Sequence, residues 1–338
     1  MSARKLQLTH LAATTPDPRL WLPEFTRRLS GLGELRICPD TAAWTEGEVL
    51  DALRHADVVL TGWNSRALPV ALAGARGRLR YICHLTGTMR AIIPRELVAA
   101  GIPVTNWGDA PADGVAEAAL ALLLGCLKVL PAHGATRRAG GWHPPELAQS
   151  GTLRGLRIGL YGYGVVGRRF HALLRPFQPV VSVYDPLAAA LPDDARPVGS
   201  LLALFAGSDA VALHAALTPE TRGSVRAEHL AALRDHGILI NTARGDLLDQ
   251  TALFAELERG RLRAGLDVLA KPEMLAADHP ARHWTNLILT GHKLWTENWP
   301  DPGRLGPLHV TALDNLARFA RGEDLRFRID ERRYDLST

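Results

Sequence analysis

Three glycines separate an apolar run from a helix-like pattern in the segment Gly155–Arg168, which reads GLRIGLYGYGVVGR. Glycines at these three spacings allow a tight turn, a close approach of the backbone to a phosphate group, and close packing of a helix on a strand. The N–H groups that open the following helix then face the anion. The segment therefore predicts a strand, a pyrophosphate-binding turn and a helix. The residues predicted to bind are Gly162, Gly164, Val165, Val166 and Gly167.

An acidic residue follows the next apolar run at the spacing expected of a ribose contact. The run Val180–Tyr184 ends at Asp185, which lies 185 − 162 = 23 residues after Gly162. A spacing of about 20 residues is typical of the acid that binds the adenosine ribose of a dinucleotide. Asp185 also suits a simple turn before Pro186, but the complete unit favours the nucleotide interpretation. Because a carboxylate repels a 2′-phosphate, the sequence predicts NAD rather than NADP as the cofactor.

Charged residues stand at the ends of three later apolar runs, which is where ligands bind in parallel sheets. Arg244 follows one run, Asp267 ends the next, and His292 follows the last. A guanidinium group offers a rigid fork of donors to a carboxylate or a keto oxygen. A histidine transfers a proton near neutral pH, and a neighbouring carboxylate orients it. Glu273, on the loop between Asp267 and His292, is the natural candidate for that carboxylate.

Each of these residues has a simpler interpretation when it is taken alone. Arg244 suits a solvated charge, His292 a histidine satisfied within a turn, and Glu273 an acid on an exposed loop. Their coincidence beside a dinucleotide pattern favours the catalytic interpretation. His214, inside an apolar run, and His84, at the end of one, are interpreted as structural.

A second polar turn follows an earlier apolar run, Tyr81–Leu85. The turn consists of Thr86, Gly87 and Thr88, and its backbone N–H groups are suited to hold a carboxylate. A plain connection between a strand and a helix explains the same residues equally well. The residues alone leave these two interpretations open.

Short apolar runs alternate with helical patterns before the glycine-rich segment, which is typical of a parallel sheet with crossover helices. The predicted strands are Leu6–Leu11, Leu35–Cys38, Val58–Thr61, Tyr81–Leu85 and Val104–Asn106. The predicted helices are Trp21–Leu29, Val49–Arg54, Pro69–Ala75 and Pro94–Ala100.

The glycine-rich segment opens a second unit, which the pattern predicts to be a six-stranded doubly wound sheet. Its strands are Ile158–Tyr161, Val180–Tyr184, Ala210–His214, Gly237–Asn241, Arg263–Val268 and Leu287–Thr290. Val115–Val129 is apolar on nearly all faces, which predicts a helix buried between domains or against another subunit. Residues Pro131–Gly151 are expected to be irregular, and the amphipathic helix Leu308–Arg321 is expected to return to the first domain.

The composition excludes several classes of protein. With 338 residues, 47% of them hydrophobic and 22% charged, the chain is long enough for two soluble domains. Its net charge of +4 is spread over scattered pairs of arginines, so no nucleic-acid partner is expected. No apolar run is long enough to span a bilayer, so no membrane partner is expected. Cys38, Cys83 and Cys126 are far apart, which argues against a metal site or a disulfide framework and favours a cytoplasmic protein.

The chain resembles the NAD-dependent D-2-hydroxyacid dehydrogenases. The resemblance covers roughly residues 80 to 325 and is carried by GLYGYGVVG, LHAALTPETRG, LINTARGDLLD, GLDV and NLILTGH, in that order. It implies a Rossmann-type nucleotide domain over residues 107–295, inserted into a flavodoxin-like α/β substrate domain over residues 1–106 and 296–338. It also implies a homodimer built on the nucleotide domains.

The resemblance assigns a role to each candidate residue by its position. Arg244 would bind the 2-keto acid, His292 would be the acid/base, and Glu273 would be its partner. Asp267 would hold the nicotinamide carboxamide, and Thr86–Thr88 would match the loop that grips the substrate carboxylate. The cofactor would also contact Thr242 and Ala243.

Three segments depart from the usual pattern of the family. The glutamate falls one residue later than usual, at Glu273, so we expect a one-residue insertion before it. The usual T-P-H is replaced by Thr290–His292, which reads TGH and loosens the backbone before the acid/base. The carboxylate loop, usually A-G-x-G, reads Leu85–Thr88 as LTGT.

The predicted function is reversible hydride transfer between NAD(H) and a small 2-keto or 2-hydroxy acid of D configuration, and the expected substrate resembles hydroxypyruvate or glyoxylate. The alternative is an NAD(H)-sensing interaction protein of the same fold, similar to the corepressors, which binds nucleotide without turnover. A related enzyme acting on formate or phosphite would need pocket residues that the sequence does not identify.

Overall fold

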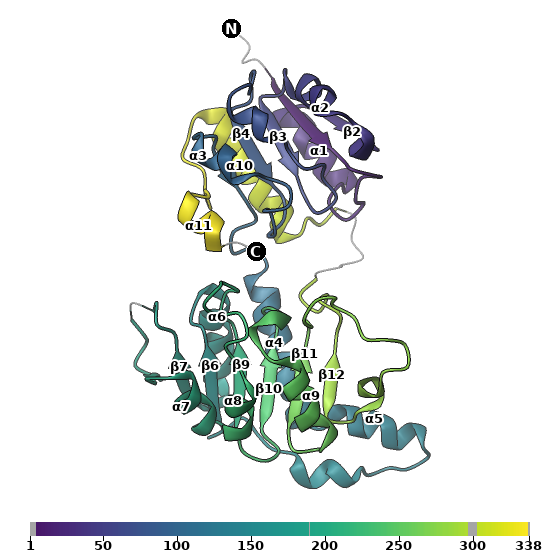
Figure 1. Cartoon of the computed structure of the whole chain (residues 1–338), viewed down its shortest axis with the longest axis vertical. Helices are drawn as coiled ribbons and strands as arrows, with labels where there is room; N and C mark the ends of the chain where they lie inside the picture. Colours follow the sequence, from purple (N-terminus) through teal and green to yellow (C-terminus); the bar gives the residue numbers. More distant parts are fainter. Residues whose placement is uncertain (1–4, 189, 297–302, 337–338) are drawn as a thin grey trace. The chain divides into compact units, whose positions relative to one another are not determined.

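The computed structural model describes residues 5–188, 190–296 and 303–336. The chain forms two compact units (Figure 1). The first unit comprises Met1–Pro111 and Glu297–Thr338, and the second unit comprises Ala112–Thr296. Residues 107–111, which the sequence assigns to the nucleotide domain, belong to the first unit. They do so because Trp107 packs edge-on against Trp63 and Gly108 lies against the ring of Phe327.

The first unit contains a five-stranded sheet in the order β2-β1-β3-β4-β5, with every pair of neighbours parallel. This is the 2-1-3-4-5 order of flavodoxin-like folds. The strands are β1 (Leu6–Leu11), β2 (Gly33–Cys38), β3 (Val58–Thr61), β4 (Tyr81–His84) and β5 (Val104–Thr105). All five were predicted from the sequence; β3 is a short apolar run, whereas β1 and β2 include polar residues between their apolar ones.

Helices cover the two faces of this sheet. They are α1 (Pro23–Leu32), α2 (Glu46–Leu53), α3 (Arg95–Ala99), α10 (Pro307–Arg321) and α11 (Glu331–Leu336). The predicted helix Pro69–Ala75 is only a short 3-10 turn over Val70–Ala73, and α11 was not predicted. As expected, α10 returns from the end of the chain and packs on α1 and β4.

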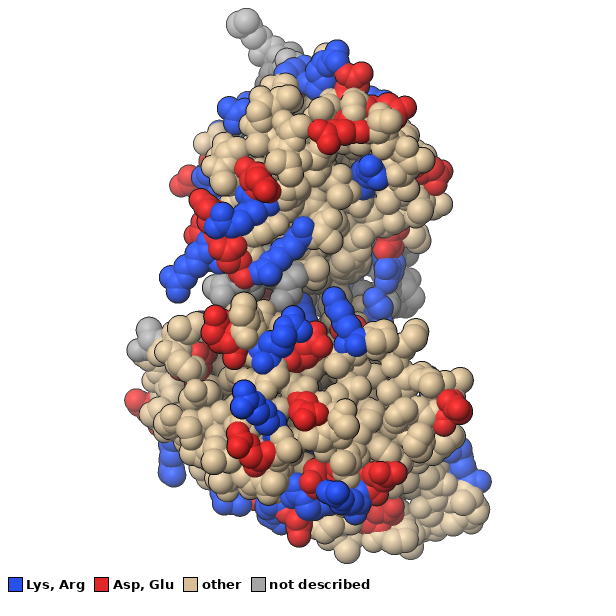
Figure 2. Space-filling view, in the orientation of Figure 1, with Lys and Arg blue, Asp and Glu red and all other residues tan. Residues whose placement is uncertain are grey.

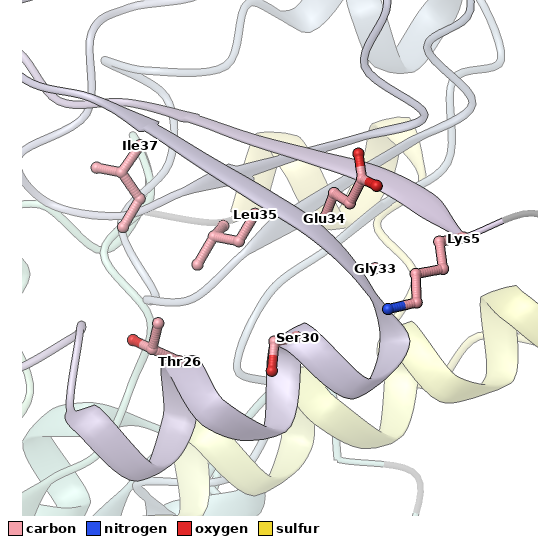
Figure 3. A pocket seen from close by; sticks show the side chains of 7 residues that line it. All are labelled: Lys5, Thr26, Ser30, Gly33, Glu34, Leu35 and Ile37. Atoms are coloured by element: carbon pink, nitrogen blue, oxygen red, sulfur yellow. The ribbon is translucent and has the colours of Figure 1, made fainter.

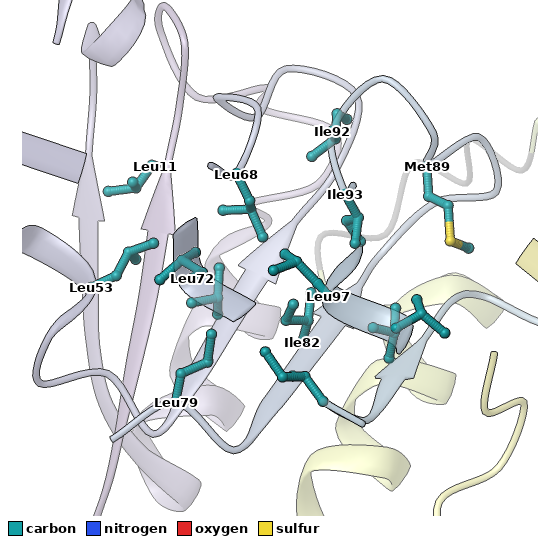
Figure 4. Packing of buried hydrophobic residues seen from close by; sticks show 14 of the residues in the cluster. Leu11, Leu53, Leu68, Leu72, Leu79, Ile82, Met89, Ile92, Ile93 and Leu97 are labelled. Carbon is teal, nitrogen blue, oxygen red and sulfur yellow. The ribbon is translucent and has the colours of Figure 1, made fainter. Parts of the chain in front are cut away.

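The core of the first unit lies on both sides of its sheet because successive strand residues point to opposite faces. Val58 and Leu60 belong to the cluster beneath α1 and α10, whereas Val59 belongs to the cluster on the other face. Figure 4 shows that second cluster. It includes Met89, whose fully buried side chain fixes the chain just beyond the Thr86–Thr88 turn.

The second unit contains a seven-stranded parallel sheet in the order β12-β11-β10-β9-β6-β7-β8. Its strands are β6 (Arg157–Tyr161), β7 (Val180–Tyr184), β8 (Ala195–Pro197), β9 (Ala210–Leu213), β10 (Ile238–Asn241), β11 (Arg263–Leu266) and β12 (Leu287–Leu289). This is the strand order of a Rossmann fold with one additional strand, β12, at the edge. The direction in which successive strands are added to the sheet reverses between β6 and β9. The prediction of six strands was wrong because it missed β8, a three-residue edge strand ending in Pro197.

Helix α4 (Ala112–Leu127) packs on β10, β11 and α6 (Val165–Leu174). Its buried residues, among them Leu122 and Leu123, therefore fill the core of the second unit itself. Pro131 lies in the first turn of α5 (Leu130–Arg138), so the expected irregular stretch begins instead with a helix, a position where proline is favoured. The remaining helices are α7 (Leu201–Ala206), α8 (Ala227–Ala232) and α9 (Gln250–Glu258).

The start and the end of the second unit meet. A Cβ atom placed on Gly114, in the first turn of α4, would lie 2.7 Å from the carbonyl oxygen of Trp295. Among the described residues, no single helix is both long and apolar enough to cross a bilayer. Helices α4 and α5 reach that length only when counted together, across a bend of 57°.

Candidate active site

The three glycines of the turn after β6 differ in their steric surroundings. Gly162 has φ of +93°, and a Cβ atom there would lie 2.5 Å from the backbone nitrogen of Ala215. A Cβ atom on Gly167 would lie 2.5 Å from the carbonyl oxygen of Gly162. Around Gly164, by contrast, a Cβ atom would have no neighbour within 4 Å. The outer glycines are therefore required by packing, whereas Gly164 leaves open space beside the backbone.

That open space adjoins the N-terminus of α6. Gly164 caps the helix without a side-chain hydrogen bond, and the first turn contains no acidic residue. Among the described residues, none accepts a hydrogen bond from the N–H groups of Val165, Val166 or Gly167. Unpaired donors at a helix start, next to an open glycine, fit the pyrophosphate of a dinucleotide.

Asp185, at the carboxyl end of β7, is held close to this turn. Its Oδ2 accepts a hydrogen bond from the backbone N–H of Tyr163 at 2.7 Å, and its Oδ1 accepts one from Leu187 at 2.8 Å. A carboxylate has about four acceptor sites, so two remain for the hydroxyl groups of a ribose. The structure thus brings the predicted ribose acid and the predicted phosphate turn together.

The turn after β10 is braced by Asn241. Its Oδ1 accepts a hydrogen bond from Ala243 N at 3.0 Å, and its Nδ2 donates to the carbonyl oxygen of Arg244 at 2.9 Å. The turn also packs tightly, because a Cβ atom on Gly245 would lie 1.9 Å from the carbonyl carbon of Leu269. The buried hydroxyl of Thr242 has no partner among the described residues, so it has unused capacity to bind a ligand.

The guanidinium of Arg244 is half-buried and donates from Nη1 to the carbonyl oxygen of Ala243 at 2.7 Å. Burial lowers the pKa of Arg244 below its ordinary value, and the negative charge of Glu273 acts in the opposite direction. An arginine stays charged at any physiological pH. The end of β10 therefore presents a fixed positive charge.

Asp267 organises the turn that carries His292. Its buried Oδ1 accepts hydrogen bonds from Thr290 Oγ1 at 2.6 Å and from Lys293 N at 3.0 Å. Its carbonyl oxygen accepts one from His292 N at 2.5 Å. Sequence reasoning did not anticipate this bracing function, which involves residues more than twenty positions apart. Its Oδ2 has no partner among the described residues.

His292 and Glu273 form a pair despite the one-residue shift of the glutamate. Nδ1 of His292 lies 2.9 Å from Oε2 of Glu273, and the two side chains are 38% and 31% exposed. Gly291 and His292 have φ of +66° and +59°. Proline is fixed near −65°, so the usual proline of the family cannot occupy position 291 in this turn.

The Thr86–Thr88 turn belongs to the first unit. Among the described residues, none accepts a hydrogen bond from the backbone N–H groups of Thr86, Gly87 or Thr88. The side chain of Thr86, however, is fully buried and lies 2.7 Å from Nε2 of His84. Any anion at this turn would therefore meet the backbone donors of Gly87 and Thr88 rather than the buried Thr86.

Other features of the surface lie apart from these residues. A groove of about 540 Å³ runs between α1 and the edge strand β2, and none of the predicted site residues lines it (Figure 3). On the face shown in Figure 2, basic and acidic side chains are interspersed. Many arginines are paired with acids, as in Arg157–Asp209 and Arg175–Asp194. Among the described residues, no cluster of His, Cys, Asp or Glu could hold a metal ion.

Residues 120–293 match the family described as D-isomer specific 2-hydroxyacid dehydrogenase, NAD binding domain. This match covers just over half of the chain. The chain belongs to the D-isomer specific 2-hydroxyacid dehydrogenase family.

Full-length relatives agree with this assignment. A hydroxypyruvate reductase of Thermotoga maritima is 36% identical over 72% of this chain and 79% of its own length. A hydroxypyruvate reductase of Blautia hydrogenotrophica is 29% identical over 87% of this chain and 91% of its own length. A solved D-isomer specific 2-hydroxyacid dehydrogenase of Xanthobacter autotrophicus Py2, in complex with NADPH and MES, is 25% identical with a TM-score of 0.72. That comparison covers 97% of this chain and 99% of the solved one.

Membership of the D-2-hydroxyacid dehydrogenases confirms the predicted fold class, enzyme class and dinucleotide cofactor. The protein is an oxidoreductase that uses a nicotinamide dinucleotide and acts on a 2-hydroxy acid. The two curated relatives described above are named as reductases, and neither supports the alternative of a nucleotide-sensing protein without turnover.

Proposed function

We propose that the protein uses NADH to reduce a small 2-keto acid of the hydroxypyruvate or glyoxylate type, and that the product has D configuration. The observation that carries this proposal is the constellation at one edge of the second sheet. Arg244 follows β10, and His292 follows β12, in the same parallel sheet that bears the glycine turn after β6. Glu273, on the loop between β11 and β12, pairs with His292. The names of the two relatives support the choice of substrate class.

Different residues bind the pyrophosphate, the adenosine ribose and the nicotinamide half of the cofactor. The glycine turn and the start of α6 bind the pyrophosphate through Gly162, Gly164, Val165, Val166 and Gly167. Asp185 binds the adenosine ribose and disfavours a 2′-phosphate, so NADH is preferred to NADPH. Thr242, Ala243 and Asp267 contact the nicotinamide half, which is consistent with the unused acceptor Oδ2 of Asp267 and the unpartnered hydroxyl of Thr242.

Arg244 binds the carboxylate and the keto oxygen of the substrate and draws electron density from C2. Bound NADH supplies the hydride that C2 receives. His292 donates a proton to the keto oxygen, so the carbonyl becomes a hydroxyl group and the imidazole becomes neutral. The carboxylate of Glu273 can only accept, so Nδ1 of His292 carries a proton and donates to it, which leaves Nε2 for the substrate.

The Thr86–Thr88 turn binds the substrate carboxylate through its backbone N–H groups. The first unit acts as the substrate domain and the second unit as the nucleotide domain. We further propose a cytoplasmic homodimer built on the second unit, without a nucleic-acid or membrane partner.

The test is NADH oxidation by the purified protein, followed at the nicotinamide absorbance. The panel contains glyoxylate, hydroxypyruvate, pyruvate and longer or phosphorylated 2-keto acids, and chiral analysis of the product gives its configuration. The control is Arg244→Gln, which removes the charge and should abolish most of the turnover while NADH still binds. Absence of turnover across the panel, with NADH binding demonstrated, would reject the proposal and favour the nucleotide-sensing alternative.

A further inference from the structure

His84 closes β4 and lies directly beneath the Thr86–Thr88 turn. Its side chain is 1% exposed, and both ring nitrogens have partners. Nδ1 lies 2.8 Å from Oγ1 of Thr61, at the end of the neighbouring strand β3. Nε2 lies 2.7 Å from Oγ1 of Thr86 and 3.0 Å from the carbonyl oxygen of Thr88. One imidazole therefore connects the strand ends to both sides of the turn.

These contacts determine where the imidazole carries its proton. The carbonyl oxygen of Thr88 can only accept a hydrogen bond, so Nε2 of His84 is the protonated nitrogen. Nδ1 then accepts a hydrogen bond from the hydroxyl group of Thr61. Burial lowers the pKa of His84 to about 4, which agrees with a neutral ring. The ring thus acts as a fixed donor on one side and a fixed acceptor on the other.

The turn is also fixed from its other sides. Met89, the next residue along the chain, is fully buried, and its carbonyl oxygen accepts hydrogen bonds from Ile92 and Ile93 at 2.8 Å each. A Cβ atom on Gly87 would lie 2.6 Å from the indole of Trp107, so this indole lies against the backbone. The Thr88 carbonyl and the Thr86 hydroxyl are turned inward to His84. The backbone N–H groups of Gly87 and Thr88, which are not fully buried, have no acceptor within the described part of the chain.

We propose that His84 is a positioning residue for substrate binding: it holds the Thr86–Thr88 turn in the conformation whose backbone N–H groups bind the substrate carboxylate. This inference rests on the proposed function of the turn. Because the ring is neutral, it adds no charge and acts only through the shape of the turn. Its effect is therefore confined to the carboxylate of the substrate and does not extend to the cofactor, which the second unit binds.

The experiment compares wild type, His84→Leu and His84→Gln in the full-length enzyme. Leucine removes both hydrogen-bonding nitrogens, whereas glutamine keeps an N–H donor near the position of Nε2. For His84→Leu we expect the KM of the best 2-keto acid to rise by at least about tenfold, as for the loss of hydrogen bonds to a charged group. We expect the Kd of NADH, measured by its fluorescence, to be unchanged, and His84→Gln to recover part of the loss.

A substrate without the carboxylate distinguishes a positioning role of His84 from a general loss of structure in the variant. The amide of the same 2-keto acid should show the same kcat/KM with wild type and His84→Leu. The matched control is His309→Leu, which removes an equally buried histidine of the first unit that contacts the carbonyl oxygen of Leu20. It should lower the melting temperature without raising KM. If His84→Leu does not fold, Thr61→Val removes only the donor to Nδ1 and should raise KM in the same direction.

The outcomes distinguish this inference from the proposed function. No turnover by wild type would overturn the proposed function itself. With an active wild type, an unchanged KM in His84→Leu would overturn the inference, as would equal losses for the acid and its amide. A rise in KM for His309→Leu as large as that for His84→Leu would also overturn it, because the effect would then be one of stability.

Discussion

The glycine turn after β6 allows stability and cofactor binding to be separated by two substitutions of the same kind. Gly162→Ala and Gly164→Ala each add one methyl group, two residues apart. At Gly162 the new Cβ atom would meet the backbone of Ala215 and His214 at 2.5 to 2.8 Å, with φ of +93°. At Gly164 it would meet no atom within 4 Å, and φ of −71° is ordinary for alanine.

The magnitudes follow from these geometries. A positive φ costs an L-residue about 1 to 2 kcal/mol, and overpacking against backbone adds about 1 to 3 kcal/mol. Gly162→Ala should therefore destabilise the second unit by about 2 to 5 kcal/mol, a fall in Tm of roughly 4 to 20 °C. Gly164→Ala should leave Tm unchanged or raise it by up to about 4 °C. Its methyl group instead occupies the space beside the free N–H groups of α6, so the Kd of NADH should rise by at least about tenfold.

Thermal unfolding followed by circular dichroism gives the first quantity, and NADH fluorescence titration gives the second. Gly199→Ala is a suitable control because its Cβ atom would also have no neighbour within 4 Å and it lies outside the turn. A loss of stability in Gly164→Ala with normal NADH binding would refute the reasoning. So would a Gly162→Ala protein as stable as wild type.

His292→Ala removes the proposed proton donor and should lower kcat by about 10²- to 10⁴-fold in steady-state NADH oxidation, whereas unchanged turnover would exclude His292 from the mechanism. Glu273→Gln should lower kcat by only about 1.4- to 5-fold, because water reduces the interaction energy of this partly exposed ion pair to about 0.2 to 1 kcal/mol. A loss of kcat beyond about a hundredfold would contradict this reasoning. Asp185→Ser should reduce the preference for NADH over NADPH, measured as the ratio of kcat/KM values, by at least about tenfold. Finally, burial lowers the pKa of His84 from 6.5 to about 4, so the unfolded chain binds more protons between these values. The contribution of His84 to stability is complete above pH 6.5 and declines as the pH falls toward 4. Between pH 7 and pH 5, wild type should therefore lose about 2 kcal/mol more than His84→Gln in urea unfolding, and parallel profiles would refute the assignment.

Most strands of both sheets could be predicted because buried parallel strands are rich in apolar residues, which a sequence displays directly. Short or exposed elements could not. Strand β8 has only three residues, two of them exposed, so it carries no hydrophobic pattern. Helix α5 carries Pro131 in its first turn, and the sequence alone does not indicate whether this proline ends one helix or starts another.

The candidate site was predictable where chemistry lies at the ends of strands. Arg244, Asp267 and His292 all follow apolar runs, so their location at the edge of the sheet follows from the topology. The direction of a side chain was not predictable. Thr86 turns inward because His84 and Thr61 offer a buried hydrogen-bonding network, and Thr61 comes from another strand. Likewise, only the positive φ of Gly291 explains why glycine replaces the usual proline of the family.

The meeting of Gly114 with Trp295 gives the second unit adjoining ends. A polypeptide spanning Ala112–Thr296 would thus begin and finish at one place, with its own sheet and core between them. We expect such a segment to fold when it is produced alone, and to tolerate a circular permutation that joins its two ends and opens a distant loop. Each operation leaves every strand pairing of its sheet intact.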